Sequence, residues 1–253
     1  IYFSNFEARE NDVIIVMSDG AIFAGLGREH PFGWGRDSII NYIQEHYSGD
    51  LTARAVAMLL ARECNRLYGG KPGDDTSFAV MRVCRREYVN LMIGPPSASD
   101  LDTKMVREFF ETEGMHIVCG GTTNRIVAHY LGKEVYASLD YGDSDLPPIY
   151  HVSGVDLATE GVVTISKVLE YGREYLEGTE LNPHWKLLDD GATRIAHALF
   201  DYATDIRFFV GCAINPAHQN PNLSIAFGAK FQLIDQLSHC LEKMGKRVNT
   251  RFF

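Results

Sequence analysis

Two acidic turns contain the residues best suited to chemistry. The first, "SDG" at 18–20, places Asp19 after the apolar run "VIIVM", and the second, "GDD" at 73–75, places Asp74 and Asp75 before the run "SFAVMRV". One interpretation is two solvated turns, because glycine and aspartate favour turns. The other is a shared divalent cation. If the two runs are neighbouring strands, Asp19 and Asp74 meet at one sheet edge, and carboxylates there suit Mg²⁺ or Mn²⁺, which activates water for attack on a phosphoryl group.

A second candidate site is the stretch "CGGTTN" at 119–124, which lies between an apolar run and a helical pattern. Free backbone N–H groups at such a helix start, with nearby hydroxyls, favour a small anionic ligand such as a nucleotide or phosphorylated metabolite. The stretch lacks the lysine of a P-loop and the third glycine of a dinucleotide fingerprint. The alternative is a tight turn in which a threonine caps the helix. The residues expected to bind the anion are Gly120, Gly121, Thr122, Thr123 and Asn124.

Two later loops gather polar side chains that could line the same site. Glu160 lies in "SGVDLATEGVVT" and Asn215 in "CAINPAHQN". A carboxylate that faces a phosphate is repelled by it, so we expect these two residues to contact a part of the ligand other than the phosphate. The alternative for the first loop is helix capping at the start of the helix expected from 162.

The elements that position the acidic turns lie in residues 1–87. We predict a strand at 13–18, helices at about 37–47 and 51–68, and a second strand, "SFAVMRV", whose weak alternation indicates burial on both faces. Together they predict part of an α/β sandwich with antiparallel strands, the helices packing on one face. In the loop "PFGWGRD", Phe32 and Trp34 either pack on the helix that follows or belong to a flap that receives substrate.

Residues 88–253 show a different rhythm, in which short apolar runs alternate with amphipathic helical patterns. Such a βαβ pattern predicts a second α/β domain with a mostly parallel sheet. The combined fold class is therefore α/β and α+β. We expect the second domain to have a ligand-binding or regulatory role, in which the ligand biases the first domain.

The order of motifs in the first domain resembles a known family. "NDVIIVMSDG", two helices and then "YGGKPGDDTSFAVMRV" resemble the C-terminal half of PPM-type protein serine/threonine phosphatases, particularly the bacterial SpoIIE-like (stage II sporulation protein E) branch. The resemblance covers residues ~10–85. It implies a binuclear Mn²⁺ or Mg²⁺ centre with Asp19 and Asp74 as ligands, Gly20 donating a carbonyl, and Asp75 orienting its neighbour. It also implies a phosphorylated regulatory protein as substrate.

The chain departs from the family in one respect. The family has an earlier aspartate, on a strand, that bridges both metals, and no such strand precedes "SDG" here. We therefore expect a fragment of a longer phosphatase. The competing hypothesis is a non-catalytic scaffold, in which a degenerate phosphatase half supports a ligand-sensing domain.

Composition narrows the function classes further. The 253 residues have a formal net charge of −9, which argues against nucleic-acid binding. The sequence contains no uninterrupted run of 18 apolar residues, so we expect no membrane span in it. The first residues do not have the pattern of a signal peptide. The five dispersed cysteines predict reduced thiols and a cytoplasmic protein.

Overall fold

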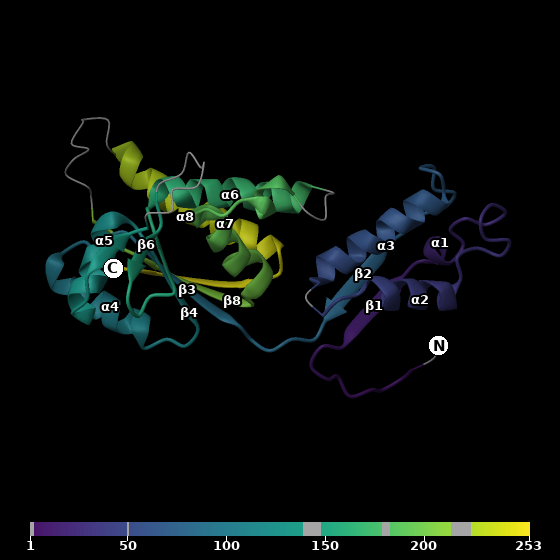
Figure 1. Cartoon of the computed structure of the whole chain (residues 1–253), viewed down its shortest axis with the longest axis horizontal. Coiled ribbons are helices and arrows are strands. Elements are labelled where there is room, and N and C mark those ends of the chain that lie inside the picture. The colour runs from purple at the N-terminus through teal and green to yellow at the C-terminus, as the bar shows by residue number, and fades with distance from the viewer. Residues whose placement is uncertain (1–2, 50, 139–147, 179–182, 214–223) are drawn as a thin grey trace. The chain divides into compact units, whose positions relative to one another are not determined.

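The computed structural model describes residues 3–49, 51–138, 148–178, 183–213 and 224–253, the last range without the side chains of its first four residues. The chain divides into two compact units, one extending to Arg85 and the other beginning at Arg86. The boundary expected from the sequence, between 87 and 88, lies two residues from this division. Figure 1 shows the elements of each unit.

The first unit is a two-stranded antiparallel sheet with helices packed on it. Strand β1 pairs with β2 so that Met17 lies opposite Phe78 and Val13 opposite Arg82. The core side chains come mainly from α2 and α3, and Thr52 caps α3 by accepting a hydrogen bond from the Ala55 amide at 3.2 Å. The elements of this unit are β1 (Val13–Met17), α1 (Asp19–Ile22), α2 (Arg36–His46), α3 (Ala53–Leu67) and β2 (Phe78–Arg82).

The prediction that β2 is buried on both faces is wrong. Phe78 and Val80 pack against the helices, whereas Met81 is 54% exposed on the other face. Val16 of β1 is also more than half exposed. The helices cover one face of this sheet only, so the strand alternates, and the apolar residues at its outward positions concealed the alternation in the sequence.

The second unit contains a seven-stranded sheet in the order β5-β6-β7-β4-β3-β8-β9. The run from β7 to β9 is parallel, and β5, β6 and β7 pair antiparallel. This confirms the predicted α/β class and the mostly parallel sheet. The strands are β3 (Tyr88–Ile93), β4 (Met115–Cys119), β5 (Val135–Ala137), β6 (Tyr150–Val152), β7 (Leu157–Thr159), β8 (Asp205–Val210) and β9 (Arg247–Phe252).

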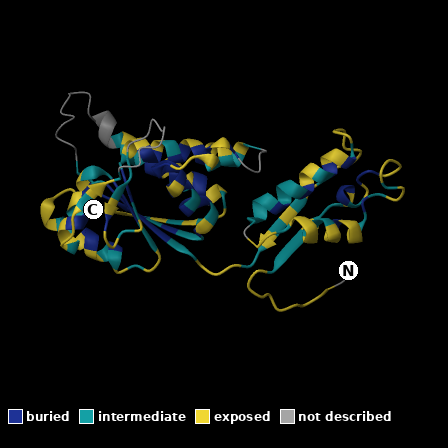
Figure 2. Ribbon diagram, viewed as in Figure 1, coloured by how far each residue is buried: buried dark blue, intermediate teal, exposed yellow. Residues whose placement is uncertain are grey.

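Helices cover both faces of this sheet. Helices α6, α7 and α8 pack on the face that presents Leu91 and Phe208, and α4 and α5 pack on the face that presents Met92 and Phe209. Figure 2 shows many of the buried residues in the central strands and on the inner sides of α6 and α7. The helices are α4 (Asp102–Phe110), α5 (Gly121–Leu131), α6 (Val162–Glu177), α7 (Gly191–Ala196), its π-helical continuation (His197–Tyr202) and α8 (Ser224–Lys243). The unit is thus a three-layer, doubly wound α/β fold.

No helix in the described ranges has the length and apolar character needed to cross a membrane.

Candidate functional site

The two acidic turns meet at one end of the β1–β2 pair. The Ser18 hydroxyl donates a hydrogen bond to the Asp75 carbonyl at 2.9 Å and accepts one from the Ser77 amide at 2.9 Å. The Ser18 amide in turn donates to the Ser77 carbonyl at 3.1 Å. Ser18 therefore ties the end of β1 to the turn that precedes β2.

Gly20 lies at the closest approach of the two turns. A Cβ atom at this position would be 2.6 Å from the Asp75 carbonyl oxygen and 2.8 Å from the Thr76 hydroxyl, so only glycine fits without a shift of backbone. The Gly20 carbonyl accepts a hydrogen bond from the Tyr68 hydroxyl at 2.7 Å. The end of α3 is thereby attached to the first acidic turn.

The carboxylates of Asp19, Asp74 and Asp75 are exposed. Asp74 Oδ1 accepts a hydrogen bond from the Asp75 backbone amide at 2.8 Å. Burial raises the pKa of Tyr68 above its ordinary value, and the negative charges of Asp74 and Asp19 raise it further. The pairing of β1 with β2 and the hydrogen bonds of Ser18 bring the two turns together, as the sequence predicts.

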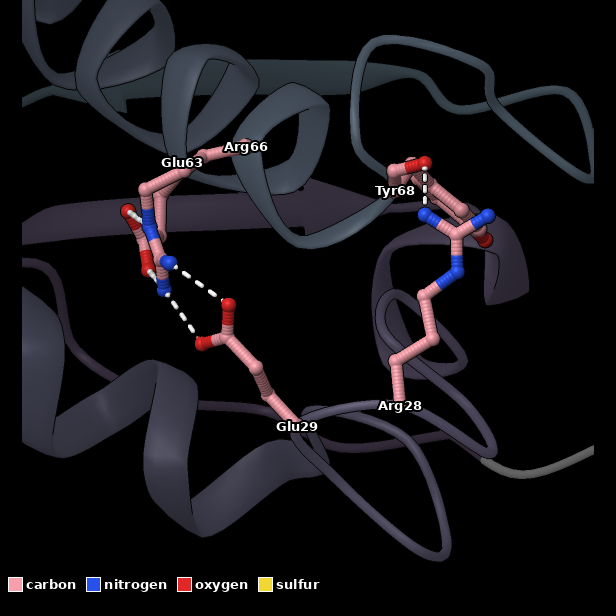
Figure 3. Close-up of polar contacts among 5 residues, drawn as sticks. All are labelled: Arg28, Glu29, Glu63, Arg66 and Tyr68. Atoms are coloured by element: carbon pink, nitrogen blue, oxygen red, sulfur yellow. Dashed lines mark hydrogen bonds and ion pairs between the residues drawn. The ribbon is translucent and has the colours of Figure 1, made fainter.

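The loop between α1 and α2 is attached to the C-terminal end of α3. Arg28 Nη1 donates to the Tyr68 carbonyl at 2.6 Å. Arg66 of α3 forms a two-pronged pair with Glu29, at 2.8 and 3.0 Å, and also binds Glu63 (Figure 3). The hydrogen bonds from Arg66 lower the pKa of Glu29 below its ordinary value. These contacts fix the loop on the same helix end that supplies Tyr68.

The aromatic residues of that loop behave differently from each other. Trp34 is buried and contacts Tyr42 edge-on, with 5.4 Å between ring centroids, as the packing interpretation predicts. Phe32 is 89% exposed, so for this residue the packing interpretation is wrong. The reason is local. Gly33 lies with φ +87° against the backbone of Ile22 and Phe23, which separates the two aromatic side chains.

In the second unit, the "CGGTTN" turn begins α5. Gly120 is the N-cap with φ 115°, and no side chain caps the helix, so the alternative of a threonine cap is wrong. Thr122 is exposed, whereas Thr123 and Asn124 are buried. Among the described residues, the Thr123 hydroxyl and Asn124 Oδ1 have no hydrogen-bond partner. They are two of nine such buried side-chain atoms in the described residues, and they are adjacent in the sequence.

Parallel pairing brings Glu160 to the same turn. Cys119 at the end of β4 lies opposite Thr159 at the end of β7, and the Asn124 side-chain amide donates to the Thr159 carbonyl at 3.0 Å. Glu160 Oε1 lies 3.6 Å from where a Cβ of Gly121 would be and accepts a hydrogen bond from the Tyr150 hydroxyl at 2.5 Å. A carboxylate therefore lies beside the start of α5. Asn215 lies outside the described residues.

Comparisons with models of protein families, with curated proteins and with solved structures found no match to this chain. Within the described ranges, no cluster of three or more histidine, cysteine, aspartate or glutamate side chains has the arrangement of a metal site.

Proposed function

We propose that the first unit supplies metal ligands to a SpoIIE-like protein serine/threonine phosphatase that acts on a phosphorylated regulatory protein. The observation that supports this is the convergence of the two acidic turns. Ser18 bonds to the backbone of Asp75 and Ser77, and Gly20 touches the Asp75 carbonyl. The motifs of the family resemblance are far apart in the sequence and lie together in space.

The donor groups suit the metal that the resemblance implies. The carboxylates of Asp19 and Asp74 and the Gly20 carbonyl are hard oxygen ligands, which Mg²⁺ and Mn²⁺ prefer. Mg²⁺ commonly binds proteins through one or two carboxylates and keeps several waters, so a pair of exposed carboxylates is a sufficient contribution from this unit. Mn²⁺ or Mg²⁺ bound there would lower the pKa of a coordinated water.

The surrounding residues hold these groups in position. Tyr68 binds the Gly20 carbonyl, and the Asp75 amide binds the Asp74 carboxylate. Arg28 binds the Tyr68 carbonyl, which attaches the loop after α1 to the same point. Asp19, Tyr68 and Asp74 thus belong to one connected arrangement, and exposure leaves both carboxylates accessible to a phosphorylated side chain of a protein substrate.

The test is a Mn²⁺ titration of the chain by calorimetry, combined with phosphate release from a phosphoserine peptide by the intact protein. Asp19→Asn and Asp74→Asn should each weaken Mn²⁺ binding by at least about tenfold. Even the loss of a group that only hydrogen-bonds to a metal ligand weakens binding by about that much. Both should also abolish Mn²⁺-dependent hydrolysis. The matched control is Asp37→Asn, which removes an acidic residue from the first turn of α2 as Asp19→Asn does from α1.

Wild-type hydrolysis without any dependence on Mn²⁺ or Mg²⁺, or variants as active as the wild type, would contradict the enzyme hypothesis. No hydrolysis by the intact protein would instead favour the non-catalytic scaffold.

A further inference from the structure

The sheet of the second unit has a point at which its winding reverses. From β3 the chain moves to β4 and then β7 on one side, and later returns to β8 and β9 on the other side of β3. The helix after β3, α4, packs on one face, and the helix after β8, α8, packs on the opposite face. In open α/β sheets of this kind, ligands bind outside the carboxyl ends of the strands at such a point.

A lysine lies at this point. Lys230 of α8 donates a hydrogen bond from Nζ to the carbonyl of Gly211, the residue that follows β8. A Cβ atom at Gly94, the residue that follows β3, would be 2.9 Å from the same Nζ. The ammonium group therefore lies over the carboxyl ends of both strands that border the reversal.

The charge of Lys230 is not neutralised by any carboxylate in the described part of the chain. Lys186 and Lys167, by contrast, form ion pairs with Asp201 and Glu170. Lys230 is also half-buried, and burial lowers the pKa of its ammonium group below the ordinary value. A cation held away from water without an opposite charge is unfavourable, and an anion bound beside it would offset that cost.

A complementary group lies further along the same edge. Glu160 follows β7, which is separated from β3 by one strand and from β8 by two. With strands about 4.8 Å apart, the end of β7 lies about 10 Å from the end of β3 and about 14 Å from the end of β8. A carboxylate repels phosphate but accepts hydrogen bonds from hydroxyl groups. Between the two lie the Gly120–Gly121 turn and the unpartnered buried atoms of Thr123 and Asn124.

We propose that the carboxyl edge of this sheet binds a phosphorylated, hydroxyl-rich small molecule, either a nucleotide or a sugar phosphate. Its phosphate pairs with Lys230 and its hydroxyls donate to Glu160, so that the body of the ligand extends along the ends of β3 and β4. This differs from the sequence-based expectation, which placed the phosphate at Gly120 and Gly121. The Glu160 carboxylate beside Gly121 disfavours that position and moves the phosphate to Lys230.

The experiment measures binding of AMP, ribose 5-phosphate, ribose and inorganic phosphate to the full chain by calorimetry. Lys230→Met should weaken AMP, ribose 5-phosphate and inorganic phosphate by about tenfold or more, the value of a hydrogen bond to a charged group. Glu160→Gln should weaken AMP and ribose 5-phosphate by about fivefold and leave inorganic phosphate unchanged, because it removes a charge near the hydroxyls only. Preference for AMP over ribose 5-phosphate identifies a nucleotide, and the reverse preference a sugar phosphate.

The matched control is Lys246→Met. Lys246 also donates Nζ to a backbone carbonyl, that of Ala203, but just before β9 begins rather than at the carboxyl edge. This variant should bind every probe as the wild type does. No binding of AMP or ribose 5-phosphate, or equal effects of Lys230→Met and Lys246→Met, would overturn the proposal. If Lys230→Met does not fold, amide chemical shifts of the wild type decide: AMP or ribose 5-phosphate should move Gly94, Gly121 and Gly211, and shifts confined elsewhere would refute the site.

Discussion

Gly20 illustrates how one residue determines the geometry of the acidic turns. It lies in α1, where alanine would ordinarily be the more stable choice by about 0.5–1 kcal/mol. The space at this position is nevertheless filled by the Asp75 carbonyl and the Thr76 hydroxyl. The close approach of the second turn therefore requires glycine here, against its helix propensity.

We predict that Gly20→Ala destabilises the first unit by about 1–3 kcal/mol, the range for inserting a methyl group into an already filled site. It should also weaken Mn²⁺ binding, because the Asp74–Thr76 turn must move away from Asp19. The measurement is urea-induced unfolding of the wild type and of Gly20→Ala, monitored by circular dichroism. Gly228→Ala is the control: Gly228 is in a helix and no atom of the described residues lies within 4 Å of its Cβ position, so alanine should stabilise there. Unchanged or increased stability of Gly20→Ala would contradict the close approach.

At the scale of elements, the loop between α1 and α2 depends on α3 for its position. Polar contacts that attach it to the end of α3 include Arg28 to the Tyr68 carbonyl and Glu29 to Arg66 (Figure 3). Arg66 and Glu29 are both about half exposed, and exposed ion pairs contribute little to global stability. We therefore expect these contacts to reduce the mobility of the loop and to change the free energy of unfolding little.

We predict that Arg66→Met increases amide hydrogen exchange across residues 24–34 and changes the global stability of the first unit by less than about 1 kcal/mol. The measurement is hydrogen exchange by mass spectrometry on the native chain. Arg107→Met, which removes an exposed pair between α4 and Glu111 directly after it, serves as the control and should leave residues 24–34 unaffected. Unchanged exchange in Arg66→Met would mean that the loop is held by Arg28 and by the packing of Trp34, without a contribution from the Arg66–Glu29 pair.

The sequence predicted the long elements better than the short ones. Apolar spacing located α2 and α3 within two residues of their observed bounds. Strand β7 was not predicted, because Leu157–Thr159 is too short to show a period and its position depends on pairing with β4. The stretch "SGVDLATEGVVT", expected to be a polar loop, contains this strand, and Glu160 follows the strand directly.

The sequence predicted those candidate-site residues that lie in turns. Asp19, Asp74 and Gly120 stand out because acidic or glycine residues adjoin apolar runs. Tyr68 follows the last residue of α3 and Lys230 lies within α8, and a helical sequence pattern does not reveal which distant turn such a residue contacts. A tyrosine directly before two glycines, at the end of a helix, is the one signal that could have drawn attention to Tyr68.

At the scale of the whole molecule, the two units have separate cores. Leu60 belongs to the core between α2, α3 and the two-stranded sheet, and Phe208 to the core under α6, α7 and α8. Both side chains are fully buried. A substitution in one core removes contacts from that core alone. Substitutions at distant sites change the free energy of unfolding additively, so we expect each to affect only its own unit.

We predict two thermal transitions in calorimetry. Leu60→Ala should lower only one of them and Phe208→Ala only the other, each by the equivalent of about 2–5 kcal/mol for a large-to-small core substitution. The proposed ligands supply an independent assignment, since a ligand stabilises only the unit that binds it. Mn²⁺ should raise the transition that Leu60→Ala lowers, and AMP or ribose 5-phosphate the transition that Phe208→Ala lowers. A single transition lowered by both substitutions would mean that the units unfold as one. Mn²⁺ raising the transition sensitive to Phe208→Ala would place the metal in the second unit and contradict the assignment of Asp19 and Asp74.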